Sequence, residues 1–139
     1  MENNKLNNYF EDGGERALLS IDYSSIEDAI DDESFGLKIE DKISEMNTSD
    51  ESLSFVLERR LEFDPQILFF LSVKIRIRLN VKEEYIGNVP WDDIDIIDEL
   101  AEESADLISE PMSRVSLLIA NITASLSSMP IVSPVGLIV

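Results

Sequence analysis

The chain has 139 residues, 44% of them hydrophobic, and carries 29 acidic against 11 basic side chains, for a net charge of −18. This charge argues against nucleic acid and anionic membranes as partners, because both bind through a cationic protein face. Cysteine and histidine are absent, which excludes disulfides, thiolate metal sites and the nucleophilic pairs that depend on histidine.

The length fits one domain, and the N-terminus lacks the basic and apolar regions of a signal peptide. Because no run of about 18 apolar residues is present either, we expect a cytoplasmic protein without a membrane span. Residues 1–15 are rich in Asn, Glu and Gly, which predicts a mobile tail. Residues 16–139 are expected to form the domain.

Four segments show the alternation of apolar and polar residues that is typical of half-buried β-strands. They cover residues 16–24, 35–46, 53–63 and 67–82. In the second segment Asp41 interrupts the apolar face, which predicts a bulge or a strand end there. The gaps between the segments look too short for crossover helices, so we predict a four-stranded antiparallel meander.

Helical periodicity follows a loop over residues 83–91. A first helix is predicted to begin near Trp91 or Asp92, and Pro111 suits the first turn of a second. One continuous helix kinked at Pro111 is the alternative. The apolar, Pro-punctuated residues 129–139 should lie extended against the body or a neighbouring subunit. The predicted fold class is therefore α+β, with one or two C-terminal helices packed on one face of the sheet.

Basic residues are concentrated in the third and fourth predicted strands. Lys74, Arg76 and Arg78 line one face of the fourth strand. They form either a docking face for an acidic partner or cross-strand ion pairs with Glu58 and Glu62. We favour the pairs, since opposite charges on neighbouring strands need no partner to explain them.

Eight acidic residues lie between Asp92 and Asp106. The Asp-x-Asp-x-Asp-Gly spacing of a calcium loop is absent, and nothing singles out a buried carboxylate pair for acid–base chemistry. A solvated helix face explains this cluster. Glycine-rich phosphate loops and catalytic serine motifs are also absent. We therefore predict no catalytic residue, no metal site and no cofactor.

The run Ile67–Leu71 is apolar on both faces of its predicted strand. Either the strand is covered on both sides there, or the run is an exposed apolar patch for a partner. Because a monomer of this size should not leave so much apolar surface open, an exposed run would be a subunit interface or a binding groove. Trp91 is an aromatic anchor for a partner or, alternatively, a plug where a loop meets a helix. The candidate partner-binding residues are Leu68, Phe69, Phe70, Leu71 and Trp91.

Two short segments in the last third of the chain resemble the motifs of a known family. They are Glu110-Pro111-Met112-Ser113-Arg114-Val115 and Met129-Pro130-Ile131-Val132-Ser133-Pro134-Val135. The first is similar to the Phe-Pro-Tyr-Ala-Arg run that opens the long helix of the SecB-like protein-export chaperones. The second is similar to the closing Pro-Pro-x-x-Leu-x-Pro-Val motif of the same family. The resemblance covers roughly residues 16–139 and is weak before residue 53.

The resemblance implies a four-stranded sheet with helices on one side, pairing through the first strand and the long helix, and a homodimer or homotetramer. It also implies ATP-independent binding of unfolded polypeptides along apolar grooves. Two features depart from the family. The fourth strand is basic where the export members present acidic residues to the translocation motor, and the metal-linked, glycine-rich tail does not follow Val135.

We therefore expect a SecB-like chaperone that captures non-native polypeptides and has no enzymatic activity. The alternative is an oligomeric structural or regulatory protein that keeps this fold and serves one dedicated partner. A carboxylate-based hydrolase is a third hypothesis, but the sequence gives no reason to expect the buried pair that it needs.

Overall fold

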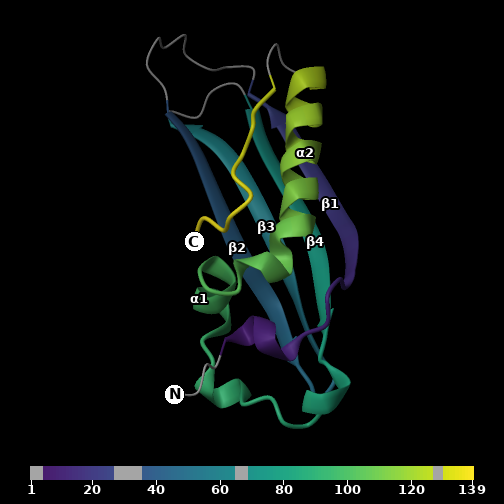
Figure 1. Ribbon diagram of the computed structural model, residues 1–139. Coiled ribbons are helices and arrows are strands. Elements are labelled where there is room, and N and C mark those ends of the chain that lie inside the picture. The colour runs from purple at the N-terminus through teal and green to yellow at the C-terminus, as the bar shows by residue number, and fades with distance from the viewer. Residues whose placement is uncertain (1–4, 27–35, 65–68, 127–129) are drawn as a thin grey trace.

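A computed structural model describes residues 5–26, 36–64, 69–126 and 130–139 (Figure 1). The strands are β1 (Glu15–Ser25), β2 (Gly36–Thr48), β3 (Ser52–Asp64) and β4 (Phe69–Asn80). The α-helices are α1 (Ile96–Ala101) and α2 (Ser109–Leu126). Four short 3-10 segments complete the described elements: η1 (Leu6–Tyr9), η2 (Glu83–Tyr85), η3 (Trp91–Asp93) and η4 (Ala105–Ile108).

The strands form one antiparallel sheet in the order β1-β4-β3-β2. The predicted four-stranded antiparallel sheet is confirmed, and β2, β3 and β4 form a meander. The prediction is wrong for the first strand, which pairs with β4 and not with β2.

One face of the sheet forms the core. The side chains of β3 and β4 that point to this face are apolar at nearly every position, because period two places alternate residues on the same side. Helix α2 and the C-terminal residues 130–139, called the tail below, lie over this face, and the tail runs beside α2 toward β2 (Figure 1). The buried residues of the two strands on this face are Leu53, Phe55, Leu57, Arg59, Leu61, Phe63, Phe69, Leu71, Val73, Ile75, Ile77 and Leu79.

The N-terminal segment is part of the core. Leu6 and Phe10 are buried, and the backbone of Leu6 donates to Glu99 Oε1 at 2.7 Å. Phe10 forms an isolated antiparallel bridge with Val81, just beyond the end of β4. The mobile tail expected for residues 1–15 is therefore wrong for residues 5–15, and residues 1–4 lie outside the described residues.

The helical region contains two separate α-helices. Trp91 begins only a single 3-10 turn, and α1 starts later, where the Asp95 side chain accepts a hydrogen bond from the Asp98 backbone. The second helix starts at Ser109, so Pro111 occupies its first turn, where a missing N–H costs nothing. In the part of the chain that the structure describes, no helix has the length and hydropathy needed to cross a bilayer.

Candidate functional site

The predicted partner-binding residues of β4 divide between its two faces. Phe69 and Leu71 are buried in the core, so they are not exposed groove material. Phe70 is half-buried on the opposite face, where the Arg60 guanidinium lies 5.7 Å from its ring centroid. Leu68 lies outside the described residues.

Trp91 lies far from Phe70 along the sheet. Its indole N–H donates to the Ser49 carbonyl at 3.3 Å, and its ring centroid is 6.0 Å from that of Phe10. Phe70 pairs with Ser24 at the start of β4, whereas Trp91 lies beyond the other end of that strand. The two aromatic residues therefore do not share a groove, and a binding role for each stays a prediction.

The basic residues of β4 lie close to acidic residues on the outer face of the sheet, and among the described residues Arg76 is the one of the three that forms an ion pair. Lys74 lies directly across from Glu58 on β3, and Arg78 lies across from Glu15 on β1. Arg76 Nη2 is 3.9 Å from Glu45 Oε2 on β2. The register thus favours ion pairing over a docking face, although Glu62 lies across from Lys38 and not from the basic residues of β4.

Seven of the eight acidic side chains around α1 are exposed, and Glu99 is half-buried. Among the described residues, no group of three or more His, Cys, Asp or Glu side chains is arranged to hold a metal ion. A hydrogen bond with Asp95, together with its negative charge, raises the pKa of Asp98 above the ordinary value of 3.8. This part of the surface is therefore a solvated acidic face.

The pKa of Asp98 is expected to fall in an Asp95→Asn variant, because the substitution removes a neighbouring negative charge. Asparagine remains an effective helix N-cap, so α1 should persist. Titration of the Asp98 carboxyl carbon by NMR measures the shift, and an unchanged pKa would contradict the assigned cause.

Apolar surface is open along the seam between β1 and α2. A bulge between Leu18 and Ser20 breaks the alternation of β1, so Leu18 and Ile21 share the face that looks toward α2. They are 55% and 40% exposed, and Leu117 on α2 is 61% exposed. We call the region lined by β1 and the first half of α2 the β1–α2 seam.

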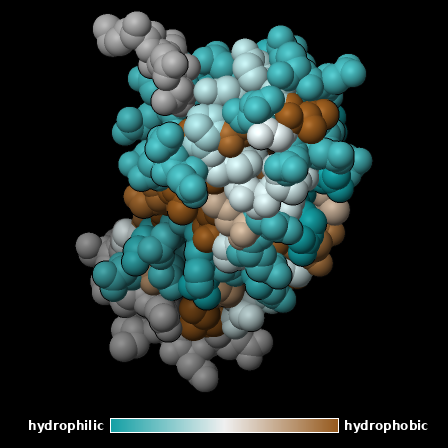
Figure 2. All heavy atoms as spheres, turned by 90° about the horizontal axis from the view of Figure 1, so that it is seen from below, coloured by the Kyte–Doolittle hydropathy of each residue, from teal (hydrophilic) through white to brown (hydrophobic). Residues whose placement is uncertain are grey.

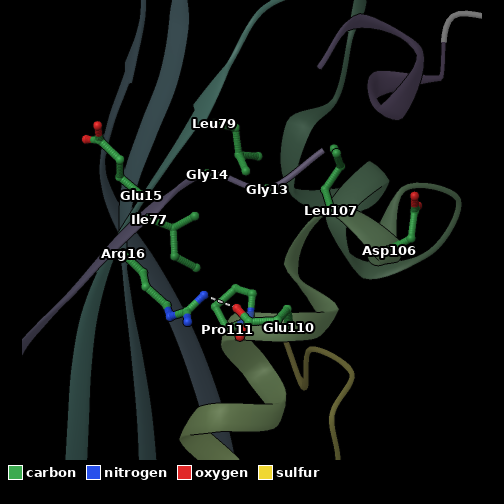
Figure 3. A pocket seen from close by; sticks show the side chains of 10 residues that line it. All are labelled: Gly13, Gly14, Glu15, Arg16, Ile77, Leu79, Asp106, Leu107, Glu110 and Pro111. Carbon is green, nitrogen blue, oxygen red and sulfur yellow. Dashed lines mark hydrogen bonds and ion pairs between the residues drawn. The ribbon is translucent and has the colours of Figure 1, made fainter. Parts of the chain in front are cut away.

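The β1–α2 seam contains two neighbouring cavities. The first has a volume of about 280 Å³ and an apolar lining from Ile77, Leu79, Leu107 and Pro111 (Figure 3). The second, of about 220 Å³, is lined by Leu18, Ile75, Pro111, Val115 and Leu118, among others. Both include Pro111 and Arg16 in their walls, so they lie end to end along the seam.

Glu110 connects the two walls of the β1–α2 seam. Its carboxylate accepts from the Arg16 guanidinium on β1 and, at 2.9 Å, from Arg114 Nε one turn further along α2. Figure 3 shows Arg16 reaching toward Glu110, while Glu15 and Asp106 point away from the cavity. All three paired side chains are about half exposed, so the network stabilises the fold only weakly.

The sequence prediction missed this seam. Val115 and Leu118 belong to the apolar stripe of the second predicted helix, but period two places Leu19, and not Leu18, on the apolar face of the first strand. The seam arises because β1 lies beside β4 and the bulge turns Leu18 toward α2. Seen end-on from below, apolar residues appear as separate clusters among hydrophilic ones (Figure 2).

A buried ion pair joins the middle of β2 and β3. Arg59 Nε and Nη2 donate to the two carboxylate oxygens of Asp41 at 2.8 and 2.7 Å, and both side chains are 0% exposed. The bulge or strand end predicted at Asp41 is therefore wrong. It lies directly across from Arg59 in unbroken register.

The ion pair also holds the C-terminal segment. Arg59 Nη1 donates to the Ser133 hydroxyl at 3.1 Å and to the Pro134 carbonyl, and Nη2 donates to the Gly136 carbonyl at 2.9 Å. Asp41 bonds to Ile138 through its backbone N–H at 2.8 Å and through its carboxylate at 2.9 Å. We call Asp41 and Arg59 the tail socket.

Comparison with known proteins identifies the fold. The sequence matches no described protein family and no curated protein. The structure is similar to that of a SecB-like chaperone from Mycobacterium tuberculosis, solved in complex with a ChAD peptide from the HigA1 antitoxin. The TM-score is 0.63 at 9% sequence identity, and the match covers 93% of this chain and 92% of the other. The SecB-like fold suggested by the two short segments is thereby confirmed.

Proposed function

We propose that this protein is a divergent SecB-like chaperone that binds extended, non-native polypeptides without ATP. The observation that carries the proposal is the β1–α2 seam, where apolar cavities lie open beside exposed Leu18. The SecB-like fold supports it, because the structural neighbour was solved with a bound peptide. Binding at the seam would be passive, through burial of apolar client side chains.

The net charge of −18 defines the favoured client. Apolar client residues would enter the seam, while basic residues close to them would be attracted by the acidic surface. The same charge keeps a loaded complex from associating with other complexes. We also propose that the chain works as a homodimer or homotetramer in the cytoplasm, as the resemblance to the SecB-like chaperones implies.

The proposal is tested by light scattering from a chemically unfolded client that aggregates as it refolds. The wild-type chain is expected to suppress aggregation, and Leu18→Gln to weaken client binding roughly tenfold, because a fully buried leucine contributes about 1.5–3 kcal/mol. Ile86→Gln is the matched control, since Ile86 is similarly exposed but lies outside the seam.

The mass of each variant in solution must be measured in the same experiment. Equal suppression by Leu18→Gln and Ile86→Gln, with unchanged mass, would contradict the seam as the binding surface. A change of mass in Leu18→Gln alone would instead assign Leu18 to a subunit interface.

A single dedicated partner is the second candidate function. It is favoured by the structural neighbour, whose bound peptide comes from one antitoxin. Under this alternative the folded wild-type chain would leave the aggregation of general clients unchanged. It would still bind one basic, apolar partner with an affinity that Leu18→Gln lowers.

A further inference from the structure

Arg59 uses every hydrogen-bond donor of its guanidinium. Two of the five N–H groups bind Asp41, and the other three bind the C-terminal segment. A buried guanidinium cannot leave three donors unpaired without a large cost. The tail socket is therefore built to be occupied, and in this structure residues 133–138 occupy it.

The tail socket binds mainly backbone atoms. Its contacts are the carbonyls of Pro134 and Gly136 and both the N–H and the carbonyl of Ile138. The hydroxyl of Ser133 is the one side-chain group that the socket contacts among the described residues. Recognition through backbone groups tolerates many sequences, as it does when a peptide joins the edge of a sheet.

The three valines of the C-terminal segment contribute little to its attachment. Val132 and Val139 are 81% and 69% exposed, and Val135 also faces solvent. Gly136 is not required by space, because an added Cβ would meet no atom within 4 Å. The contacts with the tail socket hold the segment in place together with Ile131 and Leu137, which pack against the core. Two hydrogen bonds to α2 also contribute, from the Ser116 hydroxyl to the Ser133 carbonyl and from the Ile131 N–H to the Thr123 hydroxyl.

We propose that Asp41 and Arg59 form a binding site for an extended polypeptide segment, which residues 133–138 occupy in cis and a second segment can occupy in exchange. The ligand is a stretch with a hydroxyl residue, accepting carbonyls one and three residues later, and a free N–H and carbonyl five residues later. This proposal is separate from the proposed function, because the socket lies on β2 and β3 and not at the seam.

Fluorescence anisotropy with a labelled peptide of the sequence Pro130–Val139 tests the proposal on the full chain. Ile138→Pro removes the N–H that binds Asp41 and weakens the cis segment while leaving the socket intact. This variant is expected to bind the peptide at least tenfold more tightly than wild type. Asp41→Leu/Arg59→Leu, which lacks the socket, should show no binding.

Two controls keep the result interpretable. A peptide with alanine in place of Ser133 should bind Ile138→Pro more weakly than the original peptide. Ser133→Ala in the protein provides a milder release if Ile138→Pro does not fold. The proposal is overturned if Ile138→Pro, or Ser133→Ala in its place, folds but fails to bind the peptide. It is also overturned if wild type, that variant and Asp41→Leu/Arg59→Leu bind the peptide equally.

Discussion

Replacing Arg59 by leucine is expected to lower the free energy of unfolding by about 3–5 kcal/mol. The substitution leaves the buried carboxylate of Asp41 without its bidentate partner and frees the tail from three hydrogen bonds. Urea unfolding followed by circular dichroism measures the change. Arg60→Leu is the matched control, because Arg60 is the next residue of β3 but faces solvent, and it should cost less than about 1 kcal/mol.

The Asp41→Leu/Arg59→Leu double variant should recover most of that loss. Well-packed apolar residues often replace a buried ion pair at little cost, whereas removing one partner strands the other. The tail carbonyls at Pro134 and Gly136 lie in exposed residues, so water can replace the lost donors. Equal destabilisation by Arg59→Leu and Arg60→Leu would show that the ion pair does not support the fold.

Truncating Phe10 to alanine is expected to cost about 3–5 kcal/mol, the range for a buried phenylalanine. Phe10 is buried, contacts Trp91 and pairs with Val81 beyond the end of β4. The same unfolding measurement applies. Leu19→Ala is the control, since Leu19 sits exposed at the bulge of β1 and should change stability by less than about 1 kcal/mol.

The N-terminal segment as a whole is fixed to the end of β4. Backbone bonds from Glu11 to Asn80 and from Lys82 to Tyr9 tie this segment to the end of β4. A large effect would confirm that residues 5–10 close that end of the core. A stability unchanged by Phe10→Ala would instead support the mobile tail that composition suggested.

Strands β3 and β4 could be predicted from the sequence because their alternation is long and regular. The pairing of β1 with β4 could not, since alternation defines a strand but not its neighbour. The bulge after Leu18 could not be predicted from the sequence either, because Leu18 and Leu19 are both apolar and either fits the apolar face of the strand. The position of β1 in turn decides where the seam lies.

The tail socket could not be predicted from the sequence for a different reason. Asp41 and Arg59 each interrupt an otherwise apolar face, and one such interruption alone indicates a break in a strand. Their meaning depends on the register, which places them directly opposite each other. Two opposite charges at inward positions of neighbouring strands are the signal that would have identified the pair. Leu6 and Phe10 carried no comparable signal, because their burial depends on distant residues.

The two outer strands of the sheet differ in how they can pair with another chain. On β2, the backbone N–H of Asp41 is already bonded to Ile138, and an inward charge discourages a foreign strand. On β1, no described strand covers the outer side, and Leu18 and Ile21 are exposed. A pairing of two copies through their sheets would therefore use β1, and two identical edges that pair leave no edge free for a third copy. The C-terminal segment thus leaves β1 as the one open edge among the described strands.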